Sequence, residues 1–367
     1  MHITFIIGNG FDLQNKFQTT FENFFNTISK EKKEKNYIYK AYNDINILKN
    51  ALHKGNLKDN SNSELNRVER GINEKNEEVN WADFEKCLGI LTNLVNEDIN
   101  SSNISAPDFI TDLRQLKSDF KKYLEEQTNQ FIVSQENQKK AITTTLSSFY
   151  KNLEENHRKK IVELLKLYSN LDINFINFNY TQTLDAMIES LIGTTLKIPS
   201  GIIKNDYKYY KINNPINIHR TLNTGSFLGV NDISQLNPEP FDNLSLNTLI
   251  KPNSNLGYND SLVLRAENMI KRSSIIYIFG MSLGATDKVW WQKIGNWLKS
   301  SKTNYLIINS YELKFKNQNP QEDPYLYFSL IKDKQDEFLR HVTSKNDRET
   351  IRNQIFISFN TPYFFIT

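Results

Sequence analysis

Short apolar runs and longer amphipathic segments alternate along the chain. Runs of Ile, Phe, Leu and Tyr bounded by polar residues predict buried strands at residues 1–7, 174–176, 274–279, 304–309 and 354–359. Between the first two runs, apolar residues recur every three or four positions, which predicts amphipathic helices over 21–169. The pattern therefore predicts an α/β fold in which a long helical segment separates the first strand of a parallel sheet from the others.

This arrangement predicts two parts. Residues 1–20 and 171–367 are expected to form a Rossmann-like nucleotide-binding domain, and residues 21–170 a helical insertion domain. Within the insertion, Pro107 with Asp108 is expected to open one helix, because proline is favoured in the first turn.

Glycine-rich or polar segments follow the predicted strands. They lie at 8–13, 177–181 and 280–287, with two more at 216–220 and 227–232. Because ligands bind beyond the carboxyl ends of parallel strands, these segments are expected to converge on one crevice. A Gly-x-Gly turn after a strand is typical of a dinucleotide phosphate site, although Leu13 replaces the third glycine of that fingerprint and no acidic residue follows at the usual distance.

Composition narrows the function classes. The 45 basic and 42 acidic residues give a net charge of +3, and no basic stripe with interleaved aromatics indicates a nucleic-acid groove. The single cysteine, Cys87, excludes an intrachain disulfide and a Cys-x-x-Cys zinc site, and fits a reducing cytoplasm. No apolar stretch has the length of a membrane span, and no signal peptide is indicated.

Five blocks of sequence together resemble a known family. They are Phe5 to Leu13, Trp81 to Glu85, Phe178 to Leu184, Phe227 to Asp232 and Phe279 to Asp287. They resemble the bacteriophage abortive infection AbiH family, which is similar to the SIR2-like proteins of the deoxyhypusine-synthase-like dinucleotide fold. The resemblance implies an intracellular antiphage protein with a SIR2-like pocket, and related SIR2-like defence proteins hydrolyse NAD.

The resemblance also implies a set of site residues. The expected catalytic residues are Asn179, His219 and Asp12, where the asparagine matches the catalytic one of SIR2-like strand tips. The expected NAD-binding residues, drawn from the same strand ends, are Gly8, Asn9, Gly10, Phe11, Tyr180, Arg220, Gly229, Asn231, Gly280, Ser282, Leu283 and Asp287. Two residues depart from the family pattern, since Arg220 replaces a usual glycine and Met281 a usual histidine.

The residue types suit cleavage of the nicotinamide–ribose bond, which passes through an oxocarbenium-like state. An asparagine amide binds a ribose hydroxyl or the attacking water, and a histidine accepts a proton near neutral pH. Asp12 or Asp287 would supply negative charge beside the developing cation. Arg220 would grip a phosphate bidentately.

Structural roles compete with each assignment. Asn179 is alternatively the cap of a helix starting near Thr181, His219 a satisfied histidine at a strand end, and Asp12 a partner of a helix dipole. Four aromatic side chains are expected as core or interface anchors: Trp81, Phe84, Trp290 and Trp291. Asp83 and Glu85 either lie on a solvated helix face or reach into the crevice.

The function we expect is an NAD-consuming effector of phage defence that uses no metal. The rivals are a sensor or assembly module that binds a dinucleotide without cleaving it, and a scaffold whose helices engage a phage or host protein. An esterase is a further alternative, because Gly280-x-Ser282-x-Gly284 matches a nucleophile elbow and His341 is the one later histidine. A sirtuin-type deacylase is disfavoured, since one cysteine cannot build its zinc site. Activation by a phage or host protein and homo-oligomerisation stay open.

Overall fold

The computed structural model describes residues 1–44, 47, 51, 81–95, 104–129, 131–202, 206–219, 228–230, 232–251, 260–284, 287–312, 323–342 and 345–361. The chain divides into two compact units. Unit 1 comprises Met1–Lys16, Gln130–Ile218 and Ser261–Thr367. Unit 2 comprises Phe17–Asn129 and His219–Asp260.

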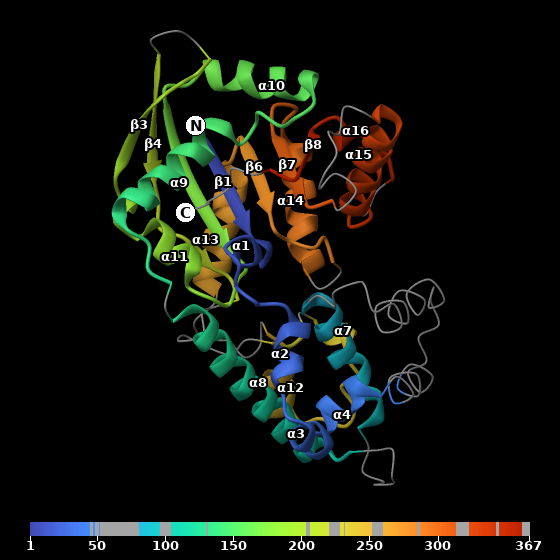
Figure 1. The fold of residues 1–367 in the computed structure, drawn as a ribbon. Coiled ribbons are helices and arrows are strands. Elements are labelled where there is room, and N and C mark those ends of the chain that lie inside the picture. The colour runs from blue at the N-terminus through green and yellow to red at the C-terminus, as the bar shows by residue number, and fades with distance from the viewer. Residues whose placement is uncertain are drawn as a thin grey trace. The chain divides into compact units, whose positions relative to one another are not determined.

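Unit 1 is built on an eight-stranded, mostly parallel sheet (Figure 1). Its strands are β1 (His2–Ile7), β2 (Asn170–Asn177), β3 (Thr195–Pro199), β4 (Tyr207–Ile212), β5 (Ile216–Asn217), β6 (Ile275–Phe279), β7 (Tyr305–Ser310) and β8 (Ile355–Phe359). The order is β3-β4-β2-β1-β6-β7-β8, and β5 pairs with β2. All pairs are parallel except β3 with β4.

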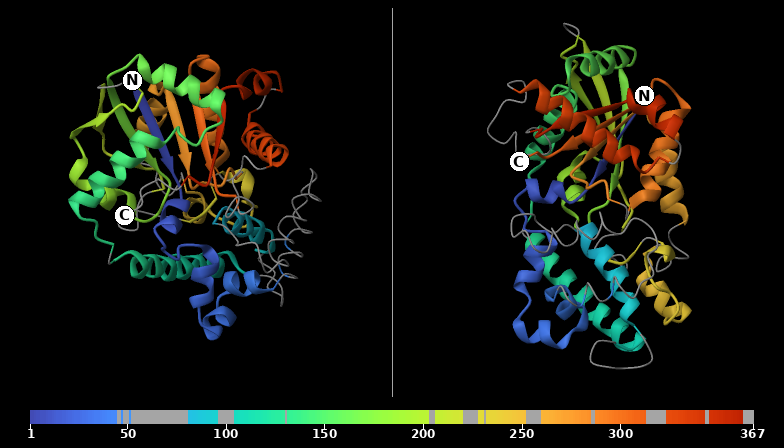
Figure 2. Two further views of the ribbon diagram at one scale, coloured as in Figure 1. Left: turned by 45° about the horizontal axis from the view of Figure 1, so that its top comes forward. Right: turned by 90° about the vertical axis from the view of Figure 1, so that its right-hand side faces the viewer.

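Both faces of this sheet are buried, which explains the continuous apolar runs. Ile3, Phe5 and Ile7 of β1 belong to one apolar cluster, and Ile6 belongs to another. Helices α9 (Gln135–Ser148), α10 (Glu155–Lys166) and α11 (Thr183–Ile188) contribute to the first cluster. Helices α13 (Asp260–Arg272), α14 (Lys288–Ser300), α15 (Pro324–Leu339) and α16 (Lys345–Arg352) contribute to the second (Figure 1; Figure 2).

The direction in which successive strands are added to the sheet reverses between β1 and β6. From β1 the chain continues to β2 on one side, and from β6 it continues to β7 on the other. The carboxyl ends of β1 and β6 are adjacent, with Ile7 paired to Phe279. In open α/β sheets ligands bind at such a switch point, so a ligand is expected beside the loops at Gly8 and Gly280.

Unit 2 is largely helical. Its helices are α2 (Phe21–Thr27), α3 (Lys30–Lys35), α4 (Tyr37–Asn43), α7 (Trp81–Leu91), α8 (Ala106–Thr128) and α12 (Asn243–Leu249), with the 3₁₀ turns η1 (Thr92–Leu94) and η3 (Ile233–Gln235). Aromatic rings fill its interior. Phe21 stacks on Phe84 with ring centroids 4.1 Å apart, and the ring centroids of Phe24 and Phe120 are 5.2 Å apart. These ring pairs join the N-terminal helices to α7 and α8.

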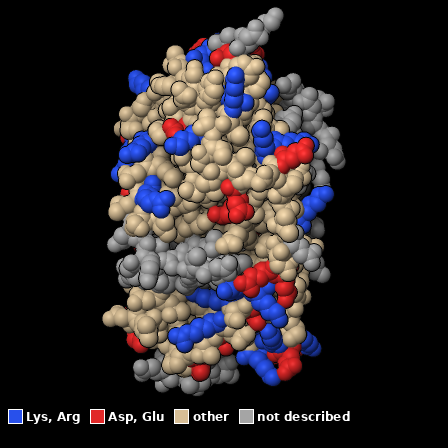
Figure 3. Space-filling model, turned by 90° about the vertical axis from the view of Figure 1, so that its left-hand side faces the viewer, with Lys and Arg blue, Asp and Glu red and all other residues tan. Residues whose placement is uncertain are grey.

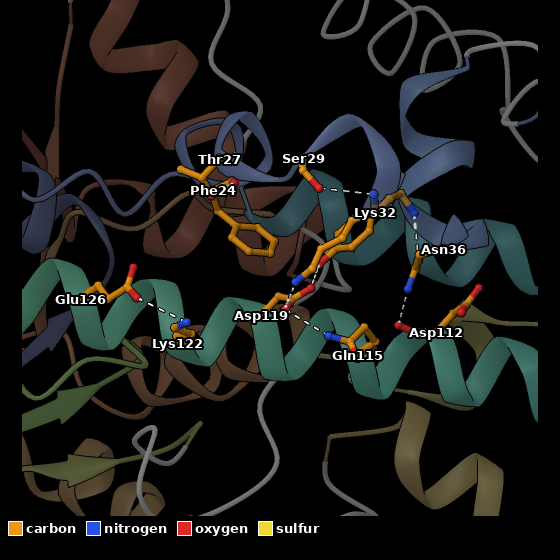
Figure 4. Close-up of polar contacts among 11 residues, drawn as sticks. Phe24, Thr27, Ser29, Lys32, Asn36, Asp112, Gln115, Asp119, Lys122 and Glu126 are labelled. Carbon is orange, nitrogen blue, oxygen red and sulfur yellow. Dashed lines mark hydrogen bonds and ion pairs between the residues drawn. The ribbon is translucent and has the colours of Figure 1, made fainter. Parts of the chain in front are cut away.

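Polar contacts set the register of α8 against α3 and α4 (Figure 4). Lys32 donates to Asp119 at 2.8 Å, and Gln115 binds the same carboxylate oxygen at 3.0 Å. The Asn36 side chain caps α4 and also donates to the Asp112 carbonyl at 2.9 Å. Ser105 caps α8, which starts with a proline in its first turn as the sequence predicts.

The structure confirms a mixed α/β fold with a mostly parallel sheet. All five predicted apolar runs lie within or overlap β1, β2, β6, β7 and β8. Residues 131–169, predicted to lie in the helical insertion, belong to unit 1, because α9 and α10 bury their apolar faces against the sheet. Whether 1–20 with 171–367 folds as a domain separate from 21–170 stays a prediction.

The surface carries both signs of charge. On the face drawn in Figure 3, lysine and arginine side chains lie among aspartate and glutamate side chains. None of the helices that the structure describes is both long enough and apolar enough to span a bilayer.

Candidate functional site

Two glycine turns pack against each other at the switch point of unit 1. The Gly8 N–H donates to the Phe279 carbonyl at 2.9 Å, and the Gly10 N–H donates to the Gly280 carbonyl at 2.8 Å. A Cβ on Gly10 would lie 2.4 Å from the Gly280 Cα, and Gly280 itself has φ +66°. The mutual approach of the two turns therefore requires glycine at these positions, independently of any ligand.

Asp12 is completely buried in the short helix α1 (Gly10–Gln14). One carboxylate oxygen accepts the Thr181 hydroxyl at 2.7 Å, and the other accepts the Thr183 hydroxyl. Burial raises the pKa of Asp12 to about 6, and the two threonine hydrogen bonds lower it in part. Asp12 thus ties the loop after β1 to the loop after β2, which is more than a helix-dipole partner would do.

Asn179 lies at the tip of β2 and is only 3% exposed. Among the residues that the structure describes, neither its Oδ1 nor its Nδ2 has a hydrogen-bond partner. The capping alternative is wrong, because α11 begins at Thr183 and its N-cap is Gln182. An unpartnered buried amide costs about 1–3 kcal/mol, so a fold alone would not favour asparagine here. A ligand or an ordered water that binds this amide would recover that free energy.

Two side chains hold the turn after β6 by hydrogen bonds to its backbone carbonyls. The His341 Nε2 lies 2.8 Å from the Leu283 carbonyl, and the Trp291 Nε1–H donates to the Gly284 carbonyl at 2.9 Å. A carbonyl only accepts, so His341 holds its proton on Nε2 and cannot use that nitrogen as the base for Ser282. This geometry argues against the esterase alternative, in which His341 would bond the exposed Ser282 hydroxyl.

The remaining predicted residues of unit 1 lie in the apolar clusters, before helices or near the surface. Phe11 and Leu283 are buried and belong to the two apolar clusters on the faces of the sheet. Asn9 and Asp287 precede helices as N-cap residues, and neither makes a side-chain cap hydrogen bond. Tyr180 is half-buried. Trp290 and Trp291 are core residues, as predicted.

The other predicted site residues do not belong to unit 1. His219 is half-buried and is the first residue of the second segment of unit 2. Gly229 lies in unit 2 with φ +153°, where a Cβ would come within 2.4 Å of the Leu249 carbonyl. Arg220 and Asn231 lie outside the described residues. The structure thus brings together the predicted residues at the ends of β1, β2 and β6.

A comparison with known families decides what the chain is. Residues 4–309 match the model of the family described as bacteriophage abortive infection AbiH. The chain belongs to the AbiH family. No curated protein matches the sequence. Membership suggests a role in bacteriophage abortive infection, and the matched span includes the Asp12 and Asn179 loops as well as all of unit 2.

Two residues of this AbiH protein that are far apart in the sequence form an ion pair inside unit 2. Glu85 is buried, and both its carboxylate oxygens accept from the Lys251 Nζ at 2.9 Å. The solvated helix face, one of the two locations expected for Glu85, is therefore wrong. Burial lowers the pKa of Lys117 to about 8; Glu85 opposes this shift, whereas Lys251 and Arg114 add to it. The side chains of Trp81 and Asp83 lie outside the described residues, and Phe84 is a core residue as predicted.

Sequence reasoning missed the partners of the predicted residues. Thr181 and Thr183 bind Asp12, Asn177 and Asn217 bind each other at 2.8 Å, and Lys251 binds Glu85. The alternation Asn177-x-Asn179-x-Thr181-x-Thr183 offered a signal, because alternate residues leaving a strand share a side. Lys251 offered none, since it lies 166 residues from its partner. Among the described residues, no group of three or more His, Cys, Asp or Glu could hold a metal ion.

Proposed function

We propose that this AbiH family protein is an antiphage effector that binds NAD at the carboxyl edge of the unit 1 sheet and hydrolyses its nicotinamide–ribose bond. The observation that carries the proposal is the buried amide of Asn179, whose donor and acceptor are both unpartnered. The hydroxyls of a ribose both donate and accept hydrogen bonds. A ribose could therefore supply partners for both the donor and the acceptor of the Asn179 amide.

The surroundings of Asn179 support a dinucleotide. Its loop joins the loop of the Gly8–Gly10 turn through the Asp12 hydrogen bonds to Thr181 and Thr183. Glycine turns after parallel strands present backbone N–H groups to phosphates, and the turn lies at the topological switch point of the sheet. The resemblance to SIR2-like proteins assigns the corresponding asparagine to catalysis.

The reaction would break the bond between the ribose C1′ and the nicotinamide nitrogen, and the bond's electron pair would neutralise the pyridinium. Water would then form the new C1′–O bond and release a proton, giving ADP-ribose and nicotinamide. In this proposal Asn179 orients the ribose or the attacking water, and the released proton passes to solvent. Asp12 positions the Asn179 loop, since both its oxygens already accept threonine hydroxyls.

A sensor that binds the dinucleotide without cleaving it is the second candidate. The observation that favours it is the complete burial of Asp12, whose two oxygens each accept a threonine hydroxyl, so that the carboxylate joins two loops of the protein. Either function would act in the cytoplasm, where NAD is found. An NAD-consuming effector would also need a trigger, and a phage or host protein bound by unit 2 would serve.

The test measures nicotinamide release from NAD and the NAD-dependent rise in melting temperature for the full-length protein. Asn179→Ala should abolish both responses without a large loss of stability, because it removes no hydrogen bond of that side chain. Asn304→Ala is the matched control: its buried side chain donates to the Trp297 carbonyl at 2.8 Å, before β7 begins. The control should lose about 1 kcal/mol of stability and keep both responses.

Each outcome decides between the candidates. Release by the wild type that Asn179→Ala abolishes supports the hydrolase. A melting shift without release supports the sensor. If millimolar NAD gives no melting shift and no nicotinamide is released, NAD is not the ligand. A ligand present at about 100 times its Kd stabilises a protein by about 2.7 kcal/mol, which a melting curve would detect.

A further inference from the structure

A chain of three hydrogen bonds leads away from Asn179. The Asn179 backbone N–H donates to Asn177 Oδ1 at 3.0 Å, and Asn177 Nδ2 donates to Asn217 Oδ1 at 2.8 Å. Asn217 Nδ2 in turn donates to Asp185 Oδ1 at 3.4 Å. A backbone N–H can only donate, and an ionised carboxylate can only accept. The two ends therefore fix the orientation of both amides between them.

This chain, which we call the Asn–Asp relay (Asn179 N–H, Asn177, Asn217 and Asp185), connects three elements. Asp185 lies on α11, Asn217 on β5 and Asn177 at the end of β2. The pairing of β5 with β2 spans two residue pairs only. The relay therefore adds two side-chain hydrogen bonds that join β5 to β2 and to α11.

A carboxylate is an expensive choice for the last position. Asp185 Oδ2 is buried without a hydrogen-bond partner, and burial raises the pKa of the group. An asparagine would accept the same hydrogen bond from Asn217 without burying a charge. The fold alone does not explain why this residue is aspartate. An amide can turn over and present its nitrogen instead of its oxygen, whereas an ionised carboxylate can only accept a hydrogen bond. Aspartate therefore fixes the direction of every hydrogen bond in the chain.

We propose that Asp185 is a positioning residue that, through Asn217 and Asn177, holds the backbone of Asn179 so that its side chain meets the ligand. The role in ligand binding rests on the proposed function of Asn179. The relay itself is a property of the free protein, so it can be tested separately.

The first measurement is hydrogen exchange of the Asn179 backbone amide in the full-length protein without ligand. Asp185→Ala should accelerate exchange at Asn179 about fivefold to tenfold, the effect of one lost hydrogen bond. Asp185→Asn keeps an acceptor but adds an amide that can turn over, so its exchange at Asn179 should lie between that of the wild type and that of Asp185→Ala. Glu189→Ala, an exposed acidic residue directly after α11, is the control and should change nothing.

A structural role alone would give a different pattern. If Asp185→Ala accelerates exchange equally across β1, β6 and Asn179, or leaves Asn179 unchanged, the positioning role is overturned. If Asp185→Ala does not fold, Asn217→Asp replaces it, because it sets two carboxylates at the 3.4 Å contact while preserving side-chain size. That variant should accelerate exchange at Asn179 as well.

The second measurement is the NAD-dependent melting shift of the same variants. Asp185→Ala should need at least about tenfold more NAD than the wild type for the same shift, and Asp185→Asn should lie between the two. An exchange effect at Asn179 without any NAD response in the wild type supports the relay and rejects the proposed ligand. An NAD response that Asp185→Ala leaves unchanged rejects the positioning role.

Discussion

Each unit contains a buried carboxylate, and the two are compensated differently. Asp12 of unit 1 accepts hydrogen bonds from two neutral hydroxyls, those of Thr181 and Thr183. Glu85 of unit 2 accepts two hydrogen bonds from the ammonium group of Lys251. Both carboxylates are almost inaccessible to solvent. The partners differ in charge.

The difference lies in the group that compensates each buried charge. Hydroxyls stabilise a carboxylate less than a cation does, so burial prevails and the pKa of Asp12 rises to about 6. An ammonium at 2.9 Å from both oxygens neutralises the charge of Glu85 in place. Residues with raised pKa values gather at functional sites, which is consistent with a site at the Asp12 loop and a structural role for Glu85.

The largest effect is expected from removing one member of the buried ion pair. Glu85→Leu leaves Lys251 buried without its carboxylate and should lower the free energy of unfolding by about 4 kcal/mol. The double variant Glu85→Leu with Lys251→Met should recover most of that loss, because the Lys251 ammonium is no longer buried without its carboxylate. Urea unfolding, with hydrogen exchange at 84–94 as the local reporter, measures both. Equal losses in the single and double variants would contradict the ion-pair account.

The Asp12 carboxylate should show itself as a pH dependence of stability. Burial raises the pKa of Asp12 from its ordinary value of 3.8 to about 6, so the folded state binds more protons than the unfolded state between these values. Its contribution to the free energy of unfolding should therefore fall by about 3 kcal/mol as the pH rises from 4 to 7. Asp12→Asn has no such titration.

The quantity to measure is the difference in unfolding free energy between the wild type and Asp12→Asn at several pH values. Taking the difference cancels the titration of all other groups. It should decline from pH 4 to pH 6 and stay level above pH 7. A difference that does not change with pH would show that the two threonine hydroxyls compensate the burial of Asp12 completely.

The contrast between the carboxylates also shows what the sequence could predict. Asp12 was a candidate because it follows a Gly-x-Gly turn, and local order reveals such turns. The burial of Glu85 could not be predicted, because helical spacing alone does not reveal which face an acidic residue occupies. The five apolar runs predicted five strands, while antiparallel β3 and β4, in which only alternate residues are buried, were not predicted. The unpartnered state of Asn179 follows from three-dimensional packing alone.

A third prediction concerns the glycines beside Asp12. Gly280→Ala puts a Cβ 2.7 Å from the Gly10 Cα at a residue with φ +66°, so it combines backbone strain with a steric clash. Gly193→Ala is the matched control, because Gly193 has φ +76° and nothing within 4 Å of the added Cβ. The control should cost about 1 kcal/mol and Gly280→Ala about 2 kcal/mol more. Equal costs would mean that the two turns separate easily to accommodate the methyl group.

The smallest effect is expected where the chemistry of the buried pair occurs at the surface. Glu31 and Lys35 form an ion pair one turn apart on α3, with side chains about three-quarters exposed (74% and 75%). Water already solvates both groups, so Glu31→Ala should change the free energy of unfolding by about 0.5 kcal/mol or less. Raising the salt concentration should remove even that difference, whereas the loss in Glu85→Leu should persist, because buried charges are screened much less. Similar salt dependence in the two variants would mean that water reaches the Glu85–Lys251 pair, and the contrast with Asp12 would then have to rest on hydration rather than on ion pairing.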